Sequence, residues 1–300
     1  MKIWLLLPLL STIALSQDDV VFRSGVSLVR VDAEAIDANG RVVAGLTKDD
    51  FRVLDEGAPQ PISNFSFEEE PLDLILLFDT AGSMRGKLLN VVRATELGFH
   101  ELHKSDRIAV RAFNAGSVEL LPFTSDLEAV NEAILIQVLK MKFGGVSRIE
   151  AAADEAALRY RTERDTHRKR AVLIVTDKPG NRGTNGANDE GAVRDLWNAN
   201  AVLSELILDR GPQTKLLERG TNEIVDQTGG ATIEAGAPGE AFLDSVHYLR
   251  SGYTMYYALP GPASQSGGSV RKIQVELTAD AAKRLPGVRI RARSGYIVSK

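Results

Sequence analysis

Side chains with oxygen atoms occur in three loops of what reads as one α/β unit. Asp79 and Ser83 follow the first apolar run of this unit, and two later loops carry Ser147 and Asp177. Ligand sites in open α/β sheets form at the carboxyl ends of the strands, where such loops meet. The four residues are therefore candidates for one binding site. The alternative for Asp79 and Ser83 is a structural role, because both side chains can cap the helix that follows them.

Alternating strands and helices predict the sheet that would position these loops. Residues 72–78 and 171–175 are nearly continuous apolar runs, as expected for central strands covered on both faces. The other expected strands are 107–113, 118–123, 201–208 and 230–234, and the expected helices are 83–103, 127–140, 149–161, 191–198, 215–227 and 241–249. We therefore predict an α/β domain over residues 71–251 with a doubly wound, mostly parallel, Rossmann-like sheet.

The segments on either side of this domain have the pattern of antiparallel strands. Residues 20–70 alternate polar and apolar positions between turns rich in Asn, Gly and Pro, and three further strands are expected after residue 252. Neither flank has enough strands for a stable sheet of its own. We therefore expect residues 17–70 and 252–300 to pair into one small antiparallel β-sandwich, into which the α/β domain is inserted.

The first sixteen residues are typical of a signal peptide. Lys2 precedes an apolar run over residues 3–10, and Ala14-Leu15-Ser16 offers the small residues that signal peptidase reads. The apolar run is shorter than the roughly 20 residues that a transmembrane helix needs. We expect export to the periplasm or the cell exterior; the alternative is a buried N-terminal strand.

The composition excludes several classes of function. A net charge of -4 provides no basic excess for binding nucleic acid or anionic lipid. The sequence contains no cysteine, which excludes disulfides, thiolate metal sites and a cysteine nucleophile. We recognise no nucleophile–base pair and no acid–base pair, so we do not expect an enzyme.

The loops and the segments that frame the α/β domain resemble the von Willebrand factor type A (vWA) family, and more narrowly its secreted relatives of the Acidobacteria type. The framing segments are residues 45–53 and 288–296, so the resemblance covers nearly the whole mature chain. It implies a metal-ion-dependent adhesion site. In that site Asp-x-Ser-x-Ser, a Thr and a later Asp hold Mg²⁺ or Mn²⁺, and an acidic side chain of the partner completes the oxygen ligands.

Matched residue by residue, this adhesion site is incomplete. Three positions agree with the family's pattern: Asp79, Ser83 and Asp177. Ala81 replaces the first Ser, and Val146 stands where the Thr is expected, with Ser147 one residue later. Lys178 follows the last Asp and would place a cation beside the site. The resemblance therefore implies a degenerate metal site made of Asp79, Ser83, Asp177 and Ser147, with Mg²⁺ or Mn²⁺ possible but not required.

Binding or adhesion is the function that the resemblance implies. We expect a secreted module that recognises a protein or a surface polymer through the loops at the carboxyl edge of the sheet. The alternative is a structural or assembly component of an envelope complex, with an inert, metal-free site. Neither hypothesis includes nucleic acid or a membrane span.

Two polar stretches and one aromatic residue complete the expectations. The charged run 159–170 is typical of a solvated helix end and loop. The loop 181–190 follows Asp177 at the edge of the candidate site and either carries function or is a surface loop. We expect Trp197 to pack in the core beneath that loop.

Overall fold

The computed structural model describes residues 27–67, 70–87, 95, 98–163, 165, 167–177, 186–208, 215–216, 223–235, 238–260 and 268–298. The expected signal peptide, Lys178 and residues 181–185 lie outside these ranges, as do residues 88–94, 96 and 97 of the helix expected at 83–103.

Within the described residues, a seven-stranded sheet forms the centre of the α/β domain, in the order β10-β11-β9-β8-β5-β6-β7. The strands are β5 (Leu72–Asp79), β6 (Arg107–Phe113), β7 (Ser117–Thr124), β8 (Lys169–Thr176), β9 (Ala201–Leu208), β10 (Lys215–Leu216) and β11 (Thr232–Ala235). The inner strands from β11 to β6 are parallel, whereas β7 and β10 pair antiparallel at the two edges. The predicted mostly parallel sheet is thus confirmed.

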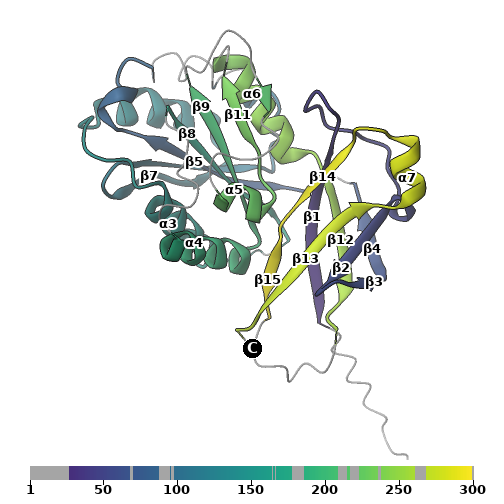
Figure 1. Ribbon diagram of the computed structural model, residues 1–300. Coiled ribbons are helices and arrows are strands. Elements are labelled where there is room, and N and C mark those ends of the chain that lie inside the picture. The colour runs from purple at the N-terminus through teal and green to yellow at the C-terminus, as the bar shows by residue number, and fades with distance from the viewer. Residues whose placement is uncertain are drawn as a thin grey trace, which may run out of the picture.

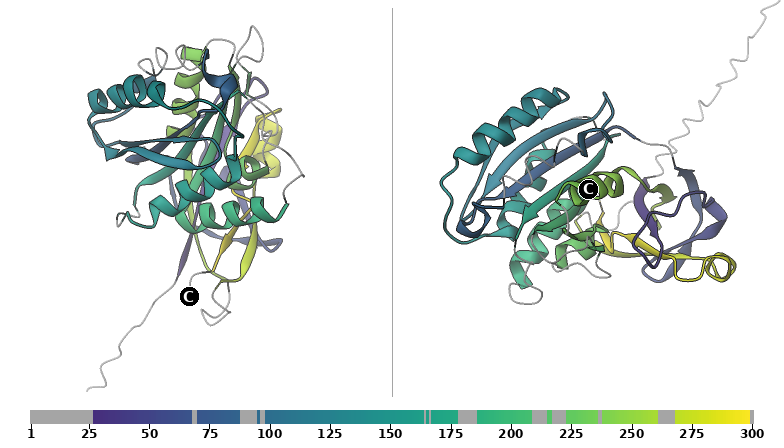
Figure 2. Two further views of the ribbon diagram at one scale, coloured as in Figure 1. Left: turned by 90° about the vertical axis from the view of Figure 1, so that its left-hand side faces the viewer. Right: turned by 90° about the horizontal axis from the view of Figure 1, so that it is seen from above.

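Helices cover both faces of this sheet, because alternate residues of its buried strands point to opposite sides (Figure 2). One face packs against α3 (Ile149–Tyr160), α4 (Gly186–Ala199) and α5 (Glu223–Thr228). The other packs against α2 (Leu127–Glu132), the π-helix η3 (Ala133–Val138) and α6 (Pro238–Arg250). The single helix expected at 215–227 is wrong at its start, since Lys215 and Leu216 pair with β11.

Two four-stranded antiparallel sheets lie beside the α/β domain, in the orders β14-β1-β12-β4 and β15-β13-β2-β3 among the described strands (Figure 1). Their strands are β1 (Leu28–Ile36), β2 (Phe51–Asp55), β3 (Ala58–Gln60), β4 (Ile62–Ser66), β12 (Tyr253–Ala258), β13 (Val270–Leu277), β14 (Arg289–Ala292) and β15 (Gly295–Ile297), with the short helices η1 (Lys48–Asp50) and α7 (Ala279–Arg284). Each sheet combines strands from both flanks, and the two share one apolar core. The Tyr257 hydroxyl also donates to the buried carboxylate of Asp55 on the opposite sheet, at 2.8 Å. We call this part the β domain.

The charged run 159–170 is only in part the solvated segment that we expected: Arg161, Thr162, Asp165 and His167 are exposed, but the last two residues are buried. Lys169 and Arg170 are each only 7% exposed. Lys169 Nζ donates to Glu34 Oε1 of the β domain at 3.1 Å, and Arg170 Nη1 donates to the carbonyl oxygen of Ala199 at 3.0 Å. Lys169 is buried because it meets an acceptor of the β domain, and Arg170 because it meets carbonyl oxygens within the α/β domain. The sequence of the run does not reveal these distant acceptors.

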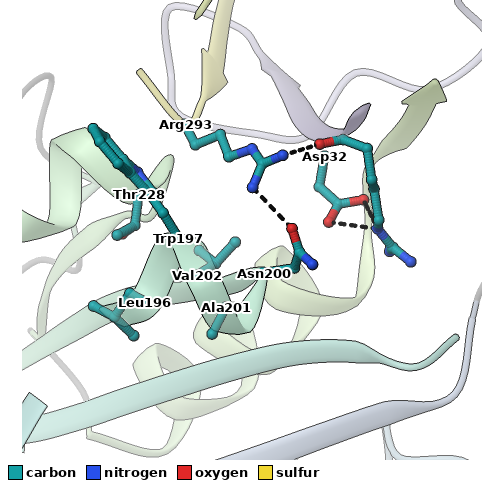
Figure 3. A pocket seen from close by; sticks show the side chains of 9 residues that line it. Asp32, Leu196, Trp197, Asn200, Ala201, Val202, Thr228 and Arg293 are labelled. Carbon is teal, nitrogen blue, oxygen red and sulfur yellow. Dashed lines mark hydrogen bonds and ion pairs between the residues drawn. The ribbon is translucent and has the colours of Figure 1, made fainter. Parts of the chain in front are cut away.

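The segment between β14 and β15 fits closely against α4 at this junction. A Cβ atom on Gly295 would lie 2.6 Å from the ring of Trp197, so only glycine allows this approach. Arg293 Nη1 donates to Asn200 Oδ1 at 2.9 Å, and Arg293 Nη2 donates to the carbonyl oxygen of Arg30 (Figure 3). Trp197 therefore packs between the domains. Trp197 belongs to a buried apolar cluster, as expected. The loop expected at 181–190 is helical from residue 186, because residues 186–190 belong to α4.

Burial of Glu34 predicts a stability that depends on pH. Desolvation raises the pKa of Glu34 from 4.5 to about 7, although the nearby ammonium of Lys169 opposes the shift. Because the folded state then binds this proton more tightly than the unfolded chain, the free energy of unfolding decreases as the pH rises from 4.5 to about 7. Glu34→Gln should remove this component, which amounts to about 3 kcal/mol.

Chemical unfolding of both proteins at a series of pH values across this window measures the difference. Equal pH dependence of the free energy of unfolding in the wild type and in Glu34→Gln would contradict the prediction.

Candidate functional site

Asp79 is the last residue of β5, and its carboxylate is completely buried. Asp79 Oδ1 accepts a hydrogen bond from the backbone N–H of Ala81 at 2.8 Å. Asp79 Oδ2 accepts from the hydroxyls of Ser147 at 2.8 Å and Thr176 at 2.7 Å. A buried carboxylate is stable only with such donors. Asp79 therefore connects three segments at the carboxyl edge of the sheet.

Asp177 directly follows β8 and binds two side chains of the loop after β5. Ser83 Oγ donates to Asp177 Oδ1 at 3.0 Å, and Lys87 Nζ donates to Asp177 Oδ2 at 3.1 Å. The side chain of Asp177 is 4% exposed and that of Lys87 is 32% exposed. The carboxylate of this ion pair is thus shielded from water, whereas the Lys87 side chain is partly exposed.

Backbone contacts hold the loop at residues 143–148 beside the loop after β5. The N–H of Gly144 donates to the carbonyl oxygen of Thr80, and the N–H of Arg148 donates to the carbonyl oxygen of Asn114, both at 3.0 Å. In the loop after β5, the short 3-10 helix η2 (Gly82–Met84) places the Met84 side chain in the core. Both loops are therefore fixed by contacts that do not involve a ligand.

A Gly-Gly turn decides which residue of the 143–148 loop reaches Asp79. Gly144 and Gly145 have φ angles of 153° and 80°, a region that favours glycine. After this turn, the hydroxyl of Ser147 points to Asp79, whereas the side chain of Val146 is 71% exposed. Ser147 thus takes the hydroxyl role even though it stands one residue later than the family's Thr.

The four residues predicted from the sequence lie together: Asp79, Ser83, Ser147 and Asp177. They form two hydrogen-bonded pairs, and Thr176 links the pairs because it precedes Asp177 and donates to Asp79. We call these four residues, with Thr176 and Lys87, the rim cluster.

The sequence reasoning missed Thr176 and Lys87. Lys87 stands four residues after Ser83, a spacing that places two side chains on one side of a helical turn. Thr176 is the hydroxyl residue directly before Asp177. Both signals were present in the sequence, but only the position next to Asp177, Lys178, was singled out as the cation. Lys178 lies outside the described residues.

The rim cluster does not fit a divalent ion in this arrangement. Mg²⁺ requires a near-ideal octahedron of oxygen ligands. Both oxygens of Asp79 already accept hydrogen bonds, and Asp177 already binds the ammonium of Lys87. Ala81 is completely buried and has no side-chain oxygen. In the part of the chain that the structure describes, no group of three or more His, Asp or Glu side chains could hold a metal ion.

The loops that carry the rim cluster also carry exposed cationic side chains. Arg85 and Arg148 are both exposed, and the guanidinium of Arg85 lies 5.9 Å from the centre of the Phe143 ring. With Lys87, these loops hold three cationic residues beside the carboxylates of Asp79 and Asp177. Val146 adds an exposed apolar side chain to the same loops.

Comparison with known proteins identifies the α/β domain. Residues 74–181 match the family model described as the von Willebrand factor type A domain. This match supports a vWA domain in this part of the chain, in agreement with the resemblance. No curated protein matches the sequence.

Several solved structures are similar to this chain. The von Willebrand factor type A protein from Catenulispora acidiphila has 12% sequence identity and a TM-score of 0.49, over 92% of this chain and 74% of that chain. The manganese-loaded TRAP protein of Plasmodium vivax has 14% identity and a TM-score of 0.48, over 77% of this chain and 96% of that chain. BatB from Bacteroides thetaiotaomicron has 21% identity and a TM-score of 0.37, over 58% of this chain and 84% of that chain.

The donors around Asp79 predict a large loss of stability when its carboxylate is removed. Asp79→Ala leaves the hydroxyls of Ser147 and Thr176 and the N–H of Ala81 without their acceptor. The free energy of unfolding should decrease by about 2 to 4 kcal/mol. Ser83→Ala removes one hydrogen bond from an exposed residue and should cost less than about 1 kcal/mol. Denaturant titration compares the two variants, and equal losses would refute the structural role of Asp79.

Proposed function

We propose that this protein is a secreted binding module of the kind that the exported vWA-related proteins of the Acidobacteria type represent. It recognises a protein or a surface polymer through the rim, which we define as residues 79–87, 143–148 and 176–177. The vWA domain suggests a binding or adhesion role, and the rim is the surface that best supports it.

The observation that carries this proposal is an exposed surface built on a rigid buried cluster. Asp79 and Asp177 fix the loops from below, while Arg85, Val146 and Arg148 remain exposed above them. Loops that a rigid scaffold positions commonly carry function. An arginine-rich surface with an apolar side chain has the composition that protein interfaces favour.

The hydrogen bonds of the rim cluster favour binding over catalysis. The hydroxyls of Ser83 and Ser147 each donate to a carboxylate, and no histidine occurs in the rim sequence to activate them. A serine nucleophile requires a base that accepts its proton and then releases it to the leaving group. We therefore propose no enzymatic activity for this site.

Export from the cytoplasm is part of the proposal and rests on the N-terminal sequence pattern, with the periplasm or the cell exterior as the destination. Among the described residues, no helix is both long and apolar enough to cross a membrane.

Matched aspartate substitutions at exposed valines test the proposed function. Val146 lies in the rim, whereas Val270 lies on β13 of the β domain and is 42% exposed. Each substitution adds one negative charge at an exposed position. Val146→Asp should weaken capture of the partner from an envelope extract by about tenfold or more, whereas Val270→Asp should not change it.

Quantitative pull-down with the wild type and the two purified variants is the measurement. If Val270→Asp abolishes capture while Val146→Asp retains it, the rim is inert. The assembly role in an envelope complex then replaces the adhesion role.

A further inference from the structure

We propose that Lys87 supplies, from within the chain, the positive charge at the rim, so that the domain binds a carboxylate of its partner without a divalent ion. This inference rests on the proposed binding function of the rim. It specifies which chemical group of the partner the rim binds, and whether a divalent ion is needed for that binding.

The first step of the argument is the position of the ammonium. Lys87 Nζ lies 3.1 Å from Asp177 Oδ2, and the other oxygen of that carboxylate accepts the hydroxyl of Ser83. Asp177 therefore has both oxygens engaged by protein groups. A divalent ion that used Asp177 would have to compete with a tethered cation at the same carboxylate.

The second step of the argument concerns the hydrogen bonds that the Asp79 carboxylate already accepts. Asp79 is completely buried, and its oxygens accept the N–H of Ala81 and the hydroxyls of Ser147 and Thr176. An octahedral ion would have to displace donors from this cluster or use hydroxyls that already donate. The two positions that depart from the family's pattern, Ala81 and Val146, cannot replace those ligands through their side chains.

The third step of the argument concerns the charged side chains that the rim exposes to a partner. Asp79 and Asp177 are shielded by their donors, whereas Lys87 is 32% exposed and Arg85 and Arg148 are exposed. A cationic surface over shielded carboxylates attracts an acidic group. A carboxylate of the partner can interact with the partly exposed Lys87 side chain, which is the chemistry that a metal-dependent site would otherwise provide through its ion.

Two titrations of the wild-type chain test the cation requirement. The first is calorimetric titration with MnCl2, for which we expect no saturable heat. The second is binding to immobilised poly-L-glutamate in EDTA and in Mn²⁺, for which we expect equal affinity that decreases with added NaCl. Saturable Mn²⁺ binding that Asp177→Asn removes, or poly-L-glutamate binding that requires Mn²⁺, would overturn the proposal.

Substitutions of Lys87 test its assigned role. Lys87→Met should weaken poly-L-glutamate binding by about tenfold, while Lys87→Arg, which keeps the charge, should stay within about twofold of the wild type. Lys283→Met is the matched control, because the Lys283 side chain is 79% exposed and lies on α7 of the β domain. Equal binding by Lys87→Met and Lys283→Met would overturn the role of Lys87. If Lys87→Met does not fold, Lys87→Arg and the MnCl2 titration of the wild type still test the proposal, because saturable Mn²⁺ binding would overturn it.

The valine variants separate this proposal from the function on which it rests. If Val146→Asp loses the natural partner while Lys87→Met binds poly-L-glutamate like the wild type, the rim binds but Lys87 is not its cation. If Val146→Asp retains the partner, the rim function itself fails, and the carboxylate specificity fails with it.

Discussion

Strand β5 carries a buried carboxylate near each end, and much of the α/β domain is arranged around the donors that these two charges need. Near the start of the strand, the fully buried Asp73 accepts hydrogen bonds from the guanidinium groups of Arg107, at 2.9 Å, and Arg168. At its end, Asp79 binds the donors of the rim cluster. Burying a carboxylate without donors would cost more free energy than a marginally stable domain can supply. The same requirement that stabilises the sheet therefore fixes the loops of the candidate site.

The central fold follows from the sequence because its signal is local. The apolar runs at β5 and β8 are long enough to indicate buried parallel strands, and parallel strands place their following loops at one edge. Where the prediction failed, contacts between segments distant in sequence determine the structure. The charged run before β8 reads as solvated, yet Lys169 meets Glu34 from a strand more than a hundred residues earlier. The residues Lys215 and Leu216 were likewise assigned to a helix, although pairing with β11 makes them a strand.

Most residues of the candidate site could be predicted from the sequence, but the hydrogen bonds and the ion pair between them could not. Comparison with the family's pattern found Asp79 and Asp177. The loop at residues 143–148 offered Ser147 one residue after the position of the family's Thr. Which of Val146 and Ser147 turns inward depends on the positive φ angles of the preceding glycines. The cation was harder to identify, because a lysine side chain is long and flexible and its direction is not encoded by its neighbours. Lys87 reaches Asp177 across the site, whereas adjacency in sequence pointed to Lys178.

A tethered ammonium gives the rim properties that a bound ion would not. Its charge is present whatever the supply of divalent ions, but Asp177 and a partner's carboxylate compete for it, so a single contact contributes little free energy. Useful affinity then depends on neighbouring contacts such as those of Arg85 and Val146, or on several copies of the domain binding one surface. The junction with the β domain suits such a role, because Lys169 binds Glu34 and Arg293 binds Asn200 across it. These contacts between the domains hold the rim in one orientation relative to the β domain. A partner can then contact several rim residues at once.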